Sequence, residues 1–224
     1  AGVHQQQQLA VGEFTPVIND TKPYAYPRLS PDGSRIAVSI NSGGRADIWS
    51  YDVSSSTPTR ITTEGSMNDR PEWTPDGKRV VFRTDRGART SIWWRPVDLS
   101  TAAEPLLASP AHDYYEGVFT SDGKTLVYQI DDASSDQANI LYRAITGDTT
   151  SAMVVGSKNV EAQGRVSPDG KWITYVTDAS GTPQVVVQPF PGGGGVTQIS
   201  VSGGSEPVWA PDGKRLYYRD GRRF

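Results

Sequence analysis

Short runs in which apolar and polar residues alternate recur along the whole chain. The clearest runs place these apolar residues two positions apart: Ile36 and Val38, Val80 and Phe82, Leu126 and Tyr128, Ile173 and Tyr175, Leu216 and Tyr218. A period of two in segments rich in Val, Ile and Tyr predicts half-buried β-strands. No window of helical length has a convincing period of 3.6 residues. The pattern therefore predicts an all-β protein.

A four-residue turn motif precedes each of these runs. Its copies are Ser30-Pro31-Asp32-Gly33, Thr74-Pro75-Asp76-Gly77, Thr120-Ser121-Asp122-Gly123, Ser167-Pro168-Asp169-Gly170 and Ala210-Pro211-Asp212-Gly213. The glycine numbers place the copies 44, 46, 47 and 43 residues apart. Pro presets φ for a type I turn, Asp bonds nearby backbone amides, and Gly accepts positive φ. The motif predicts five tight hairpin turns in a regular repeat.

Two further strands complete each full repeat. A third strand is predicted near Ile48, Ile92, Ile140 and Val185, and a shorter fourth near Ile61, Leu107, Val154 and Ile199. Four short antiparallel strands in a unit of about 45 residues are typical of a β-propeller blade. A β-sandwich is the alternative architecture, but it would not require such regular repetition.

The fifth repeat is shorter than the others. After its turn only one strand, Lys214 to Asp220, precedes the last residue, Phe224. Residues 7–12 and 14–18 are candidates for its two outer strands, and such pairing would remove unpaired edges. We therefore expect a single domain, a five-bladed propeller. Its predicted blades are residues 24–64, 68–109, 114–157, 161–202, and 204–224 completed by 5–19.

The repeat also resembles a known family. Pro71 to Gly77 and Glu206 to Gly213 best match a motif of Pro, an apolar residue, Ser or Thr, and Pro-Asp-Gly. This motif, followed by Ile-Trp, resembles the TolB-like (PD40, WD40-like) propeller repeat over residues 20–224. Tyr26 to Gly33 and Val187 to Pro191 resemble propellers attached to bacterial serine/threonine kinases, which implies a periplasmic or extracellular location. Similar repeats occur in the TolB translocation protein, the tricorn protease, and propellers that precede prolyl-oligopeptidase-type hydrolases.

Composition excludes several classes of partner and site. The net charge is -3 and the basic residues are scattered, so we expect no nucleic-acid partner. The absence of cysteine excludes disulfides, thiolate catalysis and cysteine metal sites. No apolar stretch approaches the roughly 20 residues that span a bilayer. The N-terminus lacks the charged and apolar regions of a signal peptide. We interpret the chain as a mature product or an excised domain, and we expect a monomer.

Candidate catalytic and metal-binding residues are few. His4 and His112 lie far apart and outside any HExxH pattern. No Gly-x-Ser-x-Gly motif of an α/β-hydrolase is present. Asp131, Asp132 and Asp136 lack the spacing of an EF-hand, which favours a solvated acidic loop. We expect no catalytic residue, no metal site and no cofactor.

One set of polar positions stands apart, at the start of each innermost strand. These equivalent positions, here called the mouth positions, are Tyr26, Arg70, Glu116, Gln163 and Glu206, and Asp69, Tyr115 and Glu161 lie beside three of them. In a propeller they converge on one mouth of the central channel. They differ between blades, and variation at an equivalent position is where binding specificity can reside. A hydrated channel lining without a ligand is the alternative.

The favoured hypothesis is a non-catalytic scaffold or sensor that binds a protein or peptide through the channel mouth and loops. Two alternatives stay open. A hydrolase or lyase would need two carboxylates about 5–9.5 Å apart, as in glycosidases, and Glu116 with Glu206 is the pair to test. A gating propeller of a peptidase would need a hydrolase domain beside it.

Overall fold

The structure is a computed structural model that describes residues 16–18, 20–131 and 137–221. These residues form antiparallel sheets, and none of them belongs to an apolar helix long enough to cross a membrane. Blade one comprises β1 (Tyr24–Leu29), β2 (Arg35–Ser42), β3 (Arg45–Asp52) and β4 (Pro58–Arg60). Blade two comprises β5 (Asn68–Trp73), β6 (Arg79–Thr84), β7 (Ser91–Pro96) and β8 (Glu104–Leu107).

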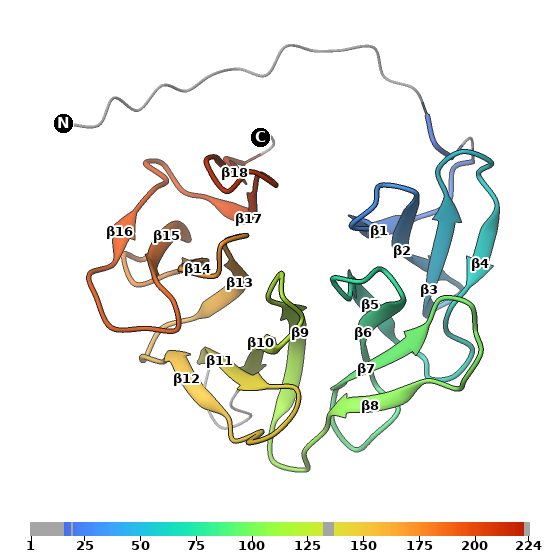
Figure 1. The fold of residues 1–224 in the computed structure, drawn as a ribbon, viewed down its shortest axis with the longest axis horizontal. Helices are drawn as coiled ribbons and strands as arrows, with labels where there is room; N and C mark the ends of the chain where they lie inside the picture. Colours follow the sequence, from blue (N-terminus) through green and yellow to red (C-terminus); the bar gives the residue numbers. More distant parts are fainter. Residues whose placement is uncertain (1–15, 19, 132–136, 222–224) are drawn as a thin grey trace.

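Blades three and four repeat this order. Blade three comprises β9 (Asp113–Phe119), β10 (Thr125–Asp131), β11 (Ala138–Ala144) and β12 (Ala152–Val155). Blade four comprises β13 (Glu161–Val166), β14 (Trp172–Thr177), β15 (Gln184–Pro189) and β16 (Thr197–Gln198). In each blade the strands pair in sequence order, and the first strand lies nearest the centre (Figure 1). The predicted all-β propeller of four-stranded blades is confirmed.

The fifth sheet has only two described strands, β17 (Ser205–Trp209) and β18 (Leu216–Arg219). Of the N-terminal runs predicted to complete it, residues 7–12 and 14–15 lie outside the described residues. Residues 16–18 are not a strand, and they lie on blade one instead. Ser56 donates a hydrogen bond to the carbonyl of Val17, and Ile18 packs against Val38, Ile40 and Tyr51. The prediction was therefore wrong for residues 16–18, because the apolar face of blade one attracts Ile18.

The hydrophobic core is divided among the spaces between blades. On β6, Val80 and Phe82 pack toward blade one, whereas Val81 packs toward blade three with Ile92 and Leu126. A third cluster joins blades three and four around Val127, Ile140, Ile173, Tyr175 and Val186. Each middle strand is thus buried on both faces, because successive side chains point to opposite faces of the sheet. This arrangement explains why the β6 run contains consecutive apolar residues.

The five turns have the predicted geometry. Each turn glycine has positive φ: Gly33 73°, Gly77 65°, Gly123 70°, Gly170 73° and Gly213 67°. In the second turn, the amide of Gly77 donates to the carbonyl of Thr74 at 2.8 Å. The Asp76 carboxylate accepts from the Thr74 hydroxyl at 2.6 Å and the Lys78 amide at 3.0 Å. The turn reading of the repeat is confirmed.

Candidate functional site

The inner strands share a β-bulge at their starting end. Pairing with the second strand shifts register between Ala25 and Arg28, Asp69 and Glu72, Ala162 and Arg165, and Ser205 and Val208. Four mouth positions lie in these bulges with left-handed backbone: Tyr26 (φ 53°), Arg70 (50°), Gln163 (58°) and Glu206 (53°). This conformation costs about 1–2 kcal/mol for a residue other than glycine. Because it recurs in four sheets, we attribute it to the fold.

Glu116 does not share this geometry. In β9 the register shift falls beside Tyr115, so that Glu116 pairs regularly with Gln129. Glu116 therefore differs from the other four mouth positions in backbone conformation. Its side chain is buried, with 6% exposed.

Three mouth residues from successive blades form one cluster, the Tyr26–Arg70–Tyr115 stack. The guanidinium carbon of Arg70 lies 4.9 Å from the ring centroid of Tyr26 and 5.7 Å from that of Tyr115. These distances are within the range of cation–π attraction. Beneath them, Arg83 lies 4.5 Å from the Tyr115 ring and donates two hydrogen bonds, of 2.8 and 2.6 Å, to Asp69. The structure thus brings Tyr26, Asp69, Arg70 and Tyr115 together.

Gln163 and Glu206 form a second group. The Glu206 amide donates to the side-chain oxygen of Gln163 at 2.7 Å, linking blade four to the fifth sheet. The Glu206 carboxylate lies 3.0 Å from a guanidinium nitrogen of Arg219. This pair is partly exposed, and pairs of that kind contribute little to stability.

One mouth residue, Glu116, belongs to an ion network with Arg28, Glu72 and Arg165 that crosses four inner strands. Arg165 donates to both carboxylate oxygens of Glu116 at 2.9 Å and lies 3.1 Å from Glu72. Arg28 contacts Glu72 at 2.5 Å and Glu116 at 3.7 Å. Burial alone raises the pKa of Glu116, but the charge and hydrogen bonds of Arg165, aided by Arg28, outweigh burial and lower it to about 2.

Sequence reasoning missed three members of this network. Arg28, Glu72 and Arg165 each follow a mouth position by two residues. Their common register in the repeat, together with their opposite charges, was the available signal.

Glu161 lies in a separate, buried environment. One of its oxygens accepts a 2.7 Å hydrogen bond from Ser157, and the other has no hydrogen-bond partner among the described residues. Burial raises the pKa of its carboxyl group. Glu161 therefore does not belong to the clusters formed by the other mouth residues.

Comparison with known proteins agrees with this geometry. The TolB β-propeller domain family (PD40) matches residues 5–162. The chain belongs to this family. No curated protein sequence matches the chain.

Solved structures share the fold. TolB from Acinetobacter baumannii superposes with a TM-score of 0.78 at 25% identity, over 92% of this chain and 51% of that one. A TolB-type protein from Agrobacterium tumefaciens gives 0.73 at 18% identity, over 88% and 69%. Oligogalacturonate lyase from Vibrio parahaemolyticus gives 0.67 at 12% identity, over 88% and 58%. The chain thus spans between half and about two thirds of the length of these relatives.

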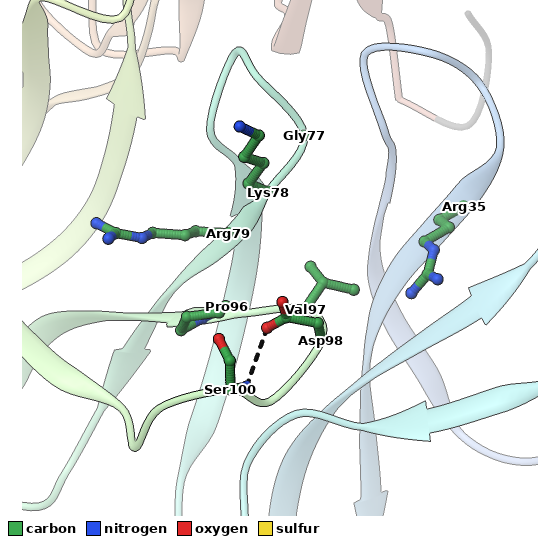
Figure 2. Close-up of a pocket in the computed structure, with 8 residues that line it drawn as sticks. All are labelled: Arg35, Gly77, Lys78, Arg79, Pro96, Val97, Asp98 and Ser100. Atoms are coloured by element: carbon green, nitrogen blue, oxygen red, sulfur yellow. Dashed lines mark hydrogen bonds between the residues drawn. The ribbon is translucent and has the colours of Figure 1, made fainter.

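A pocket of about 420 Å³ lies at the opposite, turn end of blades one and two. It is lined by Arg35, Gly77, Lys78, Arg79, Pro96, Val97, Asp98 and Ser100. Figure 2 shows that Arg79 extends away from it and that Asp98 accepts a hydrogen bond from the Ser100 amide. Among the described residues, no three His, Cys, Asp or Glu side chains form a group that could hold a metal ion. The better candidate site is the Tyr26–Arg70–Tyr115 stack.

Proposed function

We propose that this propeller is a non-catalytic binding module that holds a protein or peptide segment at the mouth end of its inner strands. The observation that carries the proposal is the Tyr26–Arg70–Tyr115 stack, built from three different blades. Tyr26 keeps 39% of its surface exposed. Tyrosine and arginine dominate the binding energy of many protein interfaces.

The ion pairs that surround the Tyr26–Arg70–Tyr115 stack favour a rigid binding surface. Arg83 is held by Asp69, and the network of Arg165 with Glu72 and Glu116 ties neighbouring inner strands together. A preorganised surface loses less conformational entropy on binding than a flexible one. The blades can therefore present the mouth residues without rearrangement of the core.

The lyase or hydrolase alternative has weaker support. A general acid needs a pKa near the working pH, usually raised by its surroundings. Glu116 instead has a lowered pKa, and both its oxygens contact Arg165. Glu206, the other carboxylate considered, is paired with Arg219. We therefore propose that the chain is not an enzyme. A hydrolase domain in the same polypeptide would favour the gating alternative.

A peptide display experiment tests the binding proposal. Peptides from a random library are selected on the parent protein, and their affinities are measured for the double variant Tyr26→Ala/Tyr115→Ala. The matched control is Trp172→Ala, which removes an exposed aromatic residue of β14. We expect at least tenfold weaker binding to the double variant and parent-like binding to the control. Equal binding to all three proteins would place the site elsewhere.

The fifth blade belongs to the same proposal. We propose that residues 7–12 supply a strand for the sheet of β17 and β18, and that the protein is a monomer. Deletion of residues 1–15 keeps Val17 and Ile18 on blade one. The deletion should therefore remove hydrogen-exchange protection from Leu216–Arg219 and promote association, measured by sedimentation. Free exchange of residues 7–12 in the parent would contradict this strand.

A further inference from the structure

The arginines at the mouth end differ in whether a carboxylate neutralises them. Arg28 and Arg165 contact Glu72 and Glu116, and Arg83 is held by Asp69. Arg70 forms no ion pair with any described residue, and its Nε is buried without a hydrogen-bond partner there. Among Arg28, Arg70, Arg83 and Arg165, three carboxylates thus neutralise three arginines, which leaves the positive charge of Arg70 over.

The other described acidic groups nearby do not neutralise the charge of Arg70. Glu116 is influenced by the charge of Arg70, but both its oxygens accept hydrogen bonds from Arg165. Asp113 is bound to Arg89 at 2.7 Å. Burial raises the pKa of Asp131, whose carboxylate accepts a 3.3 Å hydrogen bond from Gln129. Arg70 is therefore the free cation of the described mouth residues.

The surroundings of Arg70 favour a small planar anion. Its guanidinium carbon lies within 6 Å of two tyrosine ring centroids, so the rings orient the guanidinium and shield part of it from water. A guanidinium presents paired N–H donors that match the two oxygens of a carboxylate. A phosphate dianion usually recruits more than one cation, and the neighbouring Arg83 is already neutralised by Asp69.

We propose that Arg70 is the anchor for a carboxylate group of the bound protein or peptide, seated beside the rings of Tyr26 and Tyr115. This inference rests on the proposed binding function and specifies the chemistry of its ligand. The carboxylate comes from a chain terminus or from an Asp or Glu side chain. Either source would form charge-assisted hydrogen bonds with the guanidinium.

The test uses three short peptides of defined chemistry. They are acetyl-triglycine with a free carboxylate, its C-terminal amide, and acetyl-Gly-Glu-Gly amide. Each is titrated at constant ionic strength into parent protein while NMR follows the Arg70 Nε–H signal and the Tyr26 and Tyr115 rings. We expect saturable shifts with one or both carboxylate peptides and at least tenfold weaker binding of the simple amide. The two carboxylate peptides distinguish the terminal source from the side-chain source.

Substitutions of Arg70 test whether this residue binds the carboxylate. Arg70→Gln should weaken carboxylate binding about tenfold or more, since it removes the charge-assisted hydrogen bonds of the guanidinium. Arg70→Lys should restore only part of the affinity, because an ammonium lacks the paired donors. The matched control is Arg79→Gln, which removes an arginine stacked on Trp94 at 4.2 Å, away from the mouth. This control should bind like the parent.

The outcomes separate the two proposals. If library-selected peptides bind the mouth but acid and amide forms bind equally, the carboxylate anchor is wrong and the binding function stands. If no peptide of any kind affects Tyr26 or Tyr115, the binding function itself is wrong. If Arg70→Gln fails to fold, the comparison of acid and amide peptides on the parent still decides the question.

Discussion

The indole nitrogen of Trp73 donates a 2.9 Å hydrogen bond to the backbone carbonyl of Arg28 in the preceding blade. Trp209 repeats this bond to Arg165 at 3.0 Å. The two tryptophans precede the turns of their repeats, and each one joins its sheet to the neighbour. Leu29 holds the same position in blade one and is 60% exposed, since no described blade packs on that side of β1. Equivalent positions of the repeat thus contribute different amounts to the stability of the protein in different blades.

The first prediction follows from this contrast. Trp73→Ala should destabilise the protein by about 3–5 kcal/mol, the range for large aromatic residues removed from cores. Leu29→Ala, its control, should cost about 0.5 kcal/mol or less because the side chain is mostly exposed. Urea unfolding midpoints measure both. Similar midpoints for the two variants would contradict the packing of Trp73 between blades.

The second prediction concerns the turn glycine. Gly77→Val should cost about 1–2 kcal/mol or more, because a β-branched residue does not tolerate left-handed backbone. Lys78→Val changes an exposed neighbour and keeps the amide that bonds Asp76, so its effect should be small. The comparison is again made by urea unfolding. Equal losses would mean that backbone conformation at Gly77 is not what limits the turn.

The third prediction is a loss of stability in acid. The pKa of Glu116 is lowered to about 2 from the ordinary glutamate value of 4.5. A lowered pKa in the folded state adds stability above pH 4.5, and this stability disappears as the pH falls toward 2. Its size is on the order of 3 kcal/mol. Glu116→Gln should be less stable than the parent at pH 7, and the difference should shrink toward pH 2. A difference independent of pH would contradict the ion network.

The fourth prediction concerns Glu161, whose effect on stability should change with pH in the opposite direction to that of Glu116. Burial raises the pKa of Glu161 in the folded state, so that the stability it contributes is full at low pH and is lost as the pH rises through that pKa. Glu161→Gln keeps an oxygen for Ser157 and cannot ionise. The variant should gain stability relative to the parent at pH 7, and the gain should decrease as the pH falls through the raised pKa and disappear below about pH 4.5. Thermal unfolding at several pH values would measure it; a constant difference would argue against a buried, ionising carboxyl.

Much of the candidate site was predictable from the repeat. Tyr26, Arg70, Gln163 and Glu206 share their sequence register, and the structure gives all four the same left-handed backbone. Glu116 departs from them because the bulge of β9 moves by one position. A one-residue shift sends a side chain to the other face of a strand. The local sequence contains no signal that predicts this shift in β9.

The sequence alone determined the blade, because its information is local. Turn chemistry at Gly77 and the alternation of Val80 and Phe82 specify a hairpin whatever surrounds them. Only the tertiary structure decided which charges meet, since Arg165 and Glu72 lie 93 residues apart. It also decided that Arg70 has no carboxylate partner among the described residues, and that Ile18 lies on blade one. Those outcomes depend on how successive blades are rotated about a common centre, and no single repeat encodes that rotation.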